Sequence, residues 1–180
     1  MENKMFGGKK ILIRKAEKAD IKRAGRFLDF INCLVEDNAK LLMNKKTTLK
    51  EETGWVKDML CGVKNKTKVF LAAECEKKIV GTVSIELGRW RTNHVGTLSI
   101  AISNGYRGIG LGTYLMSEIM KLAKKELKPS PKVILLEVYE NNKPAIGLYK
   151  KMGFKIVARI PKQIQWNGKL IGEFVMIKVL

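Results

Sequence analysis

Cysteine and histidine are scarce in this sequence. It has three cysteines, Cys33, Cys61 and Cys75, and one histidine, His94. The cysteines are odd in number and widely spaced, so they match neither a Cys-x-x-Cys zinc pair nor a disulfide framework. We therefore expect reduced, mostly buried thiols and no metal site. No acidic residue lies near His94 in the sequence, which favours a surface or capping role for it over that of a general base.

Long apolar runs are also missing. No stretch approaches the ~20 residues that a membrane-spanning helix needs. The N-terminal sequence MENKMFGGKK lacks the apolar core of a signal peptide. Hydrophobic residues make up 46% of the chain and charged residues 29%, which is typical of a globular protein. The composition predicts one domain over residues 1–180, in the cytoplasm, with no membrane partner.

Acidic residues are few beside the basic ones. Against 17 Asp and Glu stand 35 Lys and Arg, so the formal net charge is +18, and the excess is heaviest over residues 121–180. A field of this sign attracts anionic ligands, acidic proteins or nucleic acid. Because the lysines are scattered and aromatic residues do not interleave with them, we favour a lysine-rich surface without a role in nucleic-acid binding.

The chain is organised around residues 97–127. An apolar run over 98–102 predicts a buried strand, and a Ser-Asn-Gly turn leads from it into the sequence RGIGLG, residues 107–112. Apolar residues then recur at three- and four-residue spacing, which predicts a helix. The first N–H groups of a helix have no internal partner and lie at the positive end of its dipole. We expect a phosphate-bearing ligand on residues 108–113, with Arg107 as an added cation.

The spacing of the glycines separates the known phosphate-binding loops. A Walker-type loop needs Gly-Lys-Ser/Thr after four residues, and no such string occurs. The dinucleotide fingerprint needs a glycine where this sequence has Thr113. Taken alone, the pattern R-x-x-G-x-G leaves a plain turn open as an alternative.

A second motif lies about thirty residues downstream. With R-x-x-G-x-G, it resembles the GNAT superfamily of N-acetyltransferases, whose core also carries L-x-V and N-x-x-A-x-x-L-Y-x-x-x-G-F. The resemblance is clear from about residue 68 to residue 160, and residues 100–149 look most like the ribosomal-protein N-terminal alanine acetyltransferases. The matching residues here are Leu136, Glu137, Val138, Asn142, Ala145, Leu148, Tyr149, Gly153 and Phe154.

The resemblance implies an α/β (α+β) GNAT acyl-CoA N-acyltransferase fold. Such a fold has a mixed twisted sheet of about seven strands, a V-shaped splay between two parallel central strands, and about four helices. The hydrophobic pattern and the capping residues predict four helices. One starts at Asp20, one at the capping box at Thr48, one after the glycine turn, and one covers residues 142–152. Strands are expected over residues 11–14, 69–73, 79–87, 95–102, 133–138, 154–160 and 170–179.

The resemblance also assigns a coenzyme site, with acetyl-CoA as the co-substrate. The backbone of the splayed strand would pair with the pantetheine arm and polarise the thioester. The glycine turn would hold the pyrophosphate, and Asn142 would bond the coenzyme arm. The residues expected to bind the coenzyme are Ile100, Ala101, Ile102, Arg107, Gly108, Ile109, Gly110, Leu111, Gly112, Thr113 and Asn142.

Acetyl transfer to an amine needs a base and an acid, because an ammonium has no lone pair and its pKa lies near ~10.4 for a lysine-like group. In the family the tyrosine of L-Y-x-x-x-G-F, here Tyr149, protonates the leaving thiolate. The glutamate of L-E-V serves as the base in the ribosomal-protein subgroup. We expect Glu137 to be partly buried in an apolar strand, which would raise its pKa. Glu86 and Glu173 are alternatives without a motif.

The predicted function is transfer of an acetyl group from acetyl-CoA to a primary amine by direct attack in a ternary complex. The acceptor stays open among protein N-termini, lysines, polyamines, amino acids and aminoglycosides. The variable region over residues 20–47 should help to select it. The alternative is a basic GNAT-fold module that binds nucleic acid or acidic protein without catalysis. A monomer and a homodimer are both compatible with the sequence.

Overall fold

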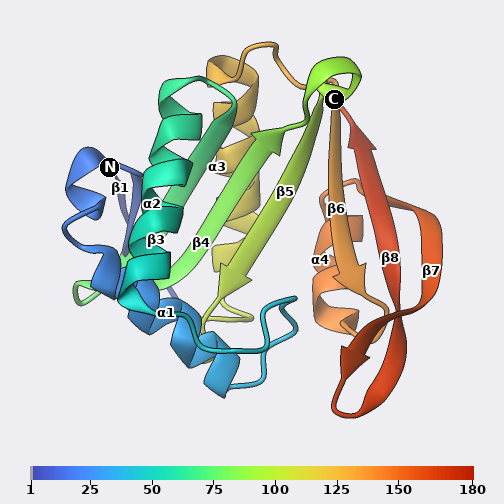
Figure 1. Cartoon of the computed structure of the whole chain (residues 1–180), viewed down its shortest axis with the longest axis horizontal. Helices are drawn as coiled ribbons and strands as arrows, with labels where there is room; N and C mark the ends of the chain where they lie inside the picture. The colour runs from blue at the N-terminus through green and yellow to red at the C-terminus, as the bar shows by residue number, and fades with distance from the viewer. Residues whose placement is uncertain (1) are drawn as a thin grey trace.

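The computed structural model describes residues 2–180, which form a mixed sheet of eight strands with four α-helices (Figure 1). The strand order is β1-β2-β3-β4-β5-β6-β8-β7. The β5–β6 pair is parallel, as predicted, and the other neighbouring pairs are antiparallel. The strands are β1 (Glu2–Phe6), β2 (Lys9–Lys15), β3 (Lys68–Cys75), β4 (Lys78–Leu87), β5 (Val95–Ile102), β6 (Val133–Tyr139), β7 (Lys155–Trp166) and β8 (Lys169–Val179).

The helices cover both faces of the sheet (Figure 1). Helices α1 and α2 pack on one face of β3 and β4, and α3 and α4 close the apolar core on the other face. No helix in the described part of the chain is long and apolar enough to cross a membrane. The helices are α1 (Ala24–Glu36), α2 (Leu49–Lys64), α3 (Leu111–Glu126) and α4 (Lys143–Lys151), with 3₁₀ turns at Lys18–Asp20 and Trp90–Thr92.

Helix α3 follows the predicted apolar pattern. Leu111, Leu115, Ile119 and Ala123 lie one turn apart and are fully buried against the sheet. Burying one such aliphatic side chain contributes about 1.5–3 kcal/mol, so this face fixes α3 firmly under β3, β4 and β5. The N-terminal end of the helix is thereby held beside the C-terminal end of β5.

The N-terminal hairpin is the element that the sequence analysis missed. Strand β1 pairs with β2 across Gly7 and Gly8, whose φ angles are +52° and +77°. A Gly-Gly pair is a typical hairpin turn because both positions can take positive φ at little cost. This strand accounts for the eighth member of the sheet.

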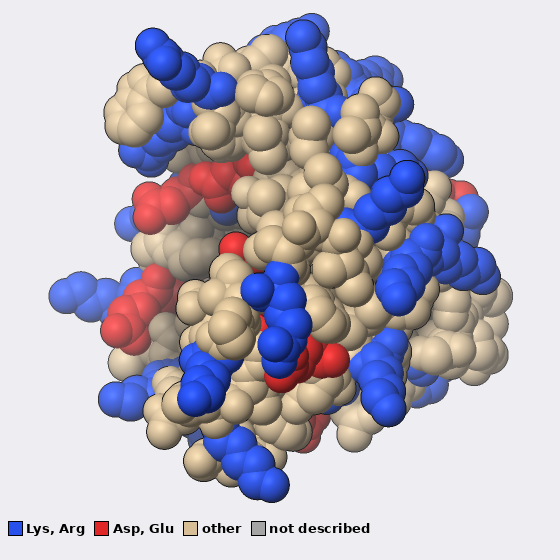
Figure 2. All heavy atoms as spheres, turned by 90° about the vertical axis from the view of Figure 1, so that its right-hand side faces the viewer, with Lys and Arg blue, Asp and Glu red and all other residues tan. Residues whose placement is uncertain are grey.

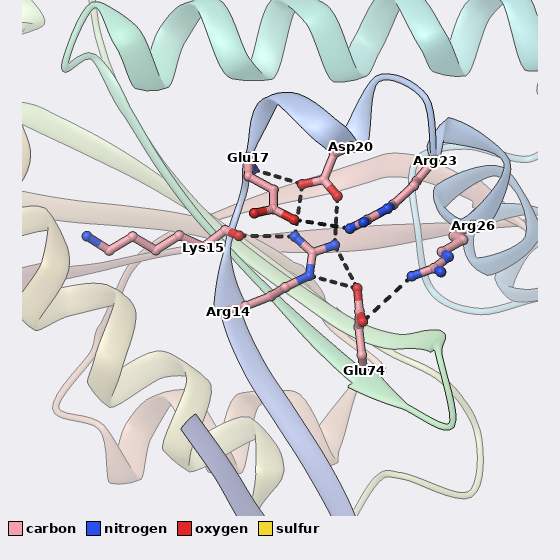
Figure 3. Close-up of polar contacts among 7 residues, drawn as sticks. All are labelled: Arg14, Lys15, Glu17, Asp20, Arg23, Arg26 and Glu74. Atoms are coloured by element: carbon pink, nitrogen blue, oxygen red, sulfur yellow. Dashed lines mark hydrogen bonds and ion pairs between the residues drawn. The ribbon is translucent and has the colours of Figure 1, made fainter. Parts of the chain in front are cut away.

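A buried ion-pair network delays the start of α1. Arg14 donates to Asp20 at 2.7 and 2.9 Å and through Nε to Glu74 at 2.8 Å (Figure 3). Asp20 also accepts a hydrogen bond from the backbone N–H of Glu17. These contacts hold Asp20 in a 3₁₀ turn, so the helix begins at Ala24 and the prediction of a start at Asp20 is wrong.

The expectation for the cysteines is wrong, whereas His94 lies at the surface as expected. Cys75 is buried, but Cys33 and Cys61 are exposed, so the prediction of mostly buried thiols is wrong. The three thiols are free. His94 is exposed at the entrance of β5, where its carbonyl accepts hydrogen bonds from Lys132 and Val133.

The positive charge is distributed over the surface. Figure 2 views the side formed by β7, β8 and α4 and shows Lys and Arg scattered widely over it, with few acidic residues among them. The exposed Arg159 is engaged with Glu140 at 2.7 Å. This distribution favours a general attraction for anions over one concentrated docking site.

Candidate active site

A cleft opens where β5 and β6 separate. Their parallel pairing covers three residue pairs, which end at Thr97 and Leu135. Beyond this point β5 stays paired with β4, and β6 with β8, while the two strands diverge toward their C-terminal ends (Figure 1). Both strands line a cleft of about 930 Å³. The edges of β5 and β6 that face this cleft therefore carry backbone groups without a ladder partner.

The glycine turn forms the wall of the cleft at the start of α3. Gly108 and Gly110 have φ angles of +74° and +89°, and Gly110 is the N-cap residue without a side-chain cap. Within residues 2–180, the amides of residues 108–113 donate to no carbonyl or side chain. A Cβ atom built on Gly108 or Gly110 would meet nothing within 4 Å. The turn thus presents free N–H groups to an open space at a helix N-terminus, which suits a phosphate.

Nine of the eleven predicted coenzyme-binding residues line the cleft. Ile109 and Leu111 do not. The Leu111 side chain is fully buried in the core, and Ile109 packs against Gly7 of the β1–β2 turn, so these two can contribute only through their amides. Arg107 donates through Nε to the carbonyl of Ile102 at 2.7 Å, which holds its guanidinium at the end of β5.

Tyr149 enters the cleft from α4. The helix has Pro144 in its first turn and ends at Lys151, and Gly153, whose φ is +88°, follows as the predicted C-terminal stop. Tyr149 packs against Phe154, is 8% exposed, and lines the cleft. Burial raises the pKa of Tyr149 to about 12. The phenol therefore keeps its proton at neutral pH and can give it to a leaving group.

Glu137 lies in the cleft, but the expected burial is wrong. Its neighbours Leu136 and Val138 point into the core, and strand alternation places Glu137 on the opposite face, where its side chain is exposed. The residue is accessible to an acceptor on the side of the cleft away from α4.

Glu173 on β8 is a second carboxylate in the same cleft, and here the burial is real. It is 4% exposed and lies opposite Tyr139 in the β6–β8 pairing. Desolvation, and to a lesser degree the charge of Glu137, raises the pKa of Glu173. No sequence motif marks this position. Its signal is only the acidic residue in an apolar strand.

The loop after α1 also lines the cleft. We call residues 38–42, which line the cleft, the strap. Tyr139 donates through its hydroxyl to the carbonyl of Leu41. Lys40 donates to the carbonyl of Asn141 at 2.9 Å, and its ammonium lies 5.3 Å from the centre of the Trp166 ring. The strap is thus tied to β6, to the loop before α4, and to the β7–β8 hairpin. The sequence predicted a basic loop here but none of these contacts.

A second hollow of about 440 Å³ continues beyond the strap. It shares Leu41, Tyr139 and Trp166 with the cleft, and amide side chains of the β7–β8 hairpin line its far wall. The indole N–H of Trp166 is buried and has no acceptor among residues 2–180. Amide side chains and an indole N–H can form hydrogen bonds with the peptide groups of an extended chain.

Comparison with known proteins places the chain in one family. The model of the acetyltransferase (GNAT) family matches residues 30–154. The N-alpha-acetyltransferase of Sulfurisphaera tokodaii is 41% identical over 97 residues, which are 49% of this chain and 57% of that protein. The L-amino acid N-acetyltransferase AaaT of Escherichia coli is 30% identical over 110 residues, 61% of this chain and 67% of that protein. The match therefore spans about three fifths of the length of these curated relatives.

Solved structures agree with this assignment. An acetyltransferase of the GNAT family from Streptococcus pneumoniae superposes with a TM-score of 0.82 at 26% identity, covering 94% of this chain and 99% of that one. Three further structures with the same fold, 10–21% identical to this chain, were solved with acetyl-CoA or coenzyme A. From the family match over more than half of its length and from its fold, this chain belongs to the acetyltransferase (GNAT) family.

Proposed function

We propose that this protein transfers the acetyl group of acetyl-CoA to a primary amine by direct attack in a ternary complex. The observation that carries the proposal is the cleft between β5 and β6, one end of which is bounded by the free amides of residues 108–113. The family to which the chain belongs supports the same chemistry. A cytoplasmic location and a single domain over residues 1–180 are kept as predictions from the sequence.

The coenzyme is expected to lie along the β5 side. Its diphosphate would accept hydrogen bonds from the amides at the start of α3, where the helix dipole adds to the attraction, and Arg107 would supply a full positive charge. The pantetheine arm would pair with the backbone of residues 100–102, because this edge of β5 lacks a partner strand beyond Thr97. Asn142, at the N-cap position of α4, lines the opposite wall with a side chain that makes no cap hydrogen bond.

The chemical step needs a proton acceptor and a proton donor on opposite sides of the thioester. Glu137 is the base that we propose, since it is exposed in the cleft and can reach an incoming amine. Backbone N–H groups of β5 would polarise the thioester carbonyl. Tyr149, protonated at neutral pH, would give its proton to the sulfur of coenzyme A as the carbon–sulfur bond breaks.

The acceptor that the second hollow favours is the amino terminus of a polypeptide. A small amine would need only the cleft, whereas the hollow beyond the strap offers amide side chains and the unpartnered Trp166 N–H to a following peptide chain. The relative from Sulfurisphaera tokodaii carries the name N-alpha-acetyltransferase, which points the same way.

Two measurements test the proposal. Calorimetry with acetyl-CoA should show saturable binding at micromolar protein. Thiol release from acetyl-CoA should be fastest with a peptide amide that has a free N-terminal alanine. It should be slower both with an N-acetylated peptide that contains lysine and with free alanine. Absence of binding to acetyl-CoA would remove the proposal. Binding with a preference for free alanine would keep the enzyme and replace the acceptor.

A further inference from the structure

The buried carboxylates of this fold differ in whether they have partners. Asp20 and Glu74 both receive hydrogen bonds from Arg14, so their charges are compensated (Figure 3). Glu173 is 96% buried, yet among residues 2–180 no side-chain hydrogen bond or ion pair to its carboxylate is found. Glu52 is also buried without such a contact, but it lies in the first turn of α2, where the helix dipole favours a negative charge, and it does not line the cleft. Glu173 is therefore a desolvated carboxylate whose one open side is the cleft.

Strand register places Glu173 beside Glu137. Glu173 is paired with Tyr139, which is two residues along β6 from Glu137, so all three side chains lie on one face of the sheet. Diagonal neighbours of this kind are about 7–8 Å apart at their Cα atoms, which long side chains can span. Both carboxylates line the cleft. A small cationic group that entered from the acceptor end would meet two acidic side chains.

Two cations close to the carboxylate pair are held by other partners. From the strap, Lys40 is held at the carbonyl of Asn141. From β7, Arg159 is bound to Glu140, one residue after Tyr139. The remaining titratable or charged side chains that line the cleft are Asp37 beside the strap, Arg107 at the end of β5, Tyr139 on β6, and Tyr149 and Lys151 on α4. Burial and the charge of Glu173 raise the pKa of Tyr139, so that phenol stays neutral.

We propose that Glu173 is a further catalytic residue, which forms with Glu137 a carboxylate pair that binds the acceptor as a primary ammonium and takes its proton. This inference rests on the proposed acetyl transfer and specifies its acceptor. The buried member supplies the more basic oxygen, since desolvation raises its pKa. The exposed member, Glu137, faces solvent and can pass the proton on.

One proton moves from the ammonium to the carboxylate pair and leaves the neutral amine with a lone pair. The nitrogen then forms a bond with the thioester carbon while the carbon–sulfur bond breaks, and the sulfur takes the proton of Tyr149. A second proton, released by the nitrogen, replaces the one that Tyr149 gave. The products are the N-acetyl amide and coenzyme A thiol, with one proton passed to solvent.

The pair also explains how a protein of net charge +18 can accept a cation. Its surface repels ammonium groups at long range, but that repulsion is screened within about 8 Å at physiological ionic strength. Inside the cleft the two carboxylates outweigh it because the desolvated site screens their charge less. The substrate class is thus a primary ammonium on a chain that can pass beneath the strap.

The test compares Glu173→Gln with a matched control, Glu52→Gln, which also removes a buried acid whose pKa burial raises. Acetylation of a peptide amide with a free N-terminal alanine is followed from pH 5 to pH 9, together with calorimetry for acetyl-CoA. For wild-type protein we expect kcat/KM to rise with pH through the raised pKa of Glu173 and then to stay flat up to the pKa of the peptide amine, about 7.7–8.0.

Glu173→Gln should lower kcat/KM for the peptide about 100-fold, the lower end of the range for a positioned base. It should also move the acid limb of the profile to lower pH, because the raised pKa is lost and Glu137 alone remains. Affinity for acetyl-CoA should not change. Glu173→Asp, which keeps the charge, should retain the acid limb and recover part of kcat/KM. Glu52→Gln should match wild type in every respect.

A Glu173→Gln protein with an unmoved acid limb and kcat/KM within twofold of wild type would overturn the carboxylate pair and leave the proposed acetyl transfer intact. Failure of Glu173→Asp to keep the acid limb would also overturn it. Failure of the wild-type protein to acetylate any amine, by contrast, would overturn the proposed function itself.

Discussion

The two sides of the cleft are built in different ways. The side under β5 and α3 is made mostly of backbone: a run of free amides over residues 108–113 and a strand edge without a partner. The side under the strap and β8 is made of side chains, among them Glu137, Glu173, Tyr139 and Trp166, which come from three separate segments. Tyr149 lines the same cleft from α4, and we expect it to act where the two sides meet.

Under the proposed function, this difference follows from what each side would bind. A diphosphate and a pantetheine arm are the same for every acetyl-CoA-dependent enzyme, and backbone groups held by a helix and a strand suffice for them. An amine acceptor has to be distinguished from others, and that requires particular side chains at particular places. Substitutions should therefore affect either coenzyme affinity or acceptor kinetics, and only a residue between the two sides should affect the chemical step alone.

The largest effect is expected at the boundary. Tyr149→Phe should lower kcat about 100- to 10,000-fold, the usual range for loss of a positioned acid, while calorimetric affinity for acetyl-CoA stays near wild type. Tyr106→Phe, which changes a tyrosine outside the cleft, is the control and should leave kcat unchanged. Unchanged turnover in Tyr149→Phe would remove this residue from the mechanism.

The second-largest effect is expected on the coenzyme side of the cleft and concerns affinity for acetyl-CoA. Gly110→Val should weaken acetyl-CoA binding about 100-fold or more, because each lost hydrogen bond to a charged group costs about 1.5–3 kcal/mol. Gly8→Val is a matched control: Gly8 also has a positive φ, +77°, and open space around its Cβ position, but it lies in the β1–β2 turn. Both variants should lose comparable stability in thermal melts. Equal coenzyme affinity in the two would contradict a binding site at the start of α3.

The smallest effect is expected on the acceptor side of the cleft and concerns the KM for the peptide. Lys40→Ala removes the contacts of the strap with Asn141 and Trp166, and it should raise KM for the peptide about 3- to 10-fold, as expected for a net hydrogen-bond contribution of about 0.5–1.5 kcal/mol. Coenzyme affinity should be preserved. Lys45→Ala, an exposed lysine in the same loop, is the control. A change in coenzyme affinity without a change in KM would show that the strap serves the other side.

The same difference decides how much could be predicted from the sequence. The elements of the proposed coenzyme side were predictable because residues 98–113 are consecutive, so a strand, a glycine turn and a helix start can be recognised together. The parallel pair and the splay followed from the family resemblance, and the structure contains both. Local patterns also predicted the start of α2 at its capping box on Thr48 and the stop of α4 before Gly153.

The acceptor side could not be predicted in this way. Glu173 is 36 residues from Glu137, and the strap is about a hundred residues from both Tyr139 and Asn141. Only sheet register and loop packing bring them together. Strand alternation gave the face of Glu137 relative to its neighbours but not which face the core covers, so the burial expected for Glu137 falls on Glu173 instead.

The most direct test of the central claim is an NMR titration of the ¹⁵N-labelled protein with acetyl-CoA. We expect saturable changes in amide chemical shift that are largest for residues 108–113, smaller for residues 100–102, and near zero for residues 61–64 at the C-terminal end of α2, which packs on the other face of the sheet. Saturable binding with its largest changes outside the cleft between β5 and β6 would contradict it.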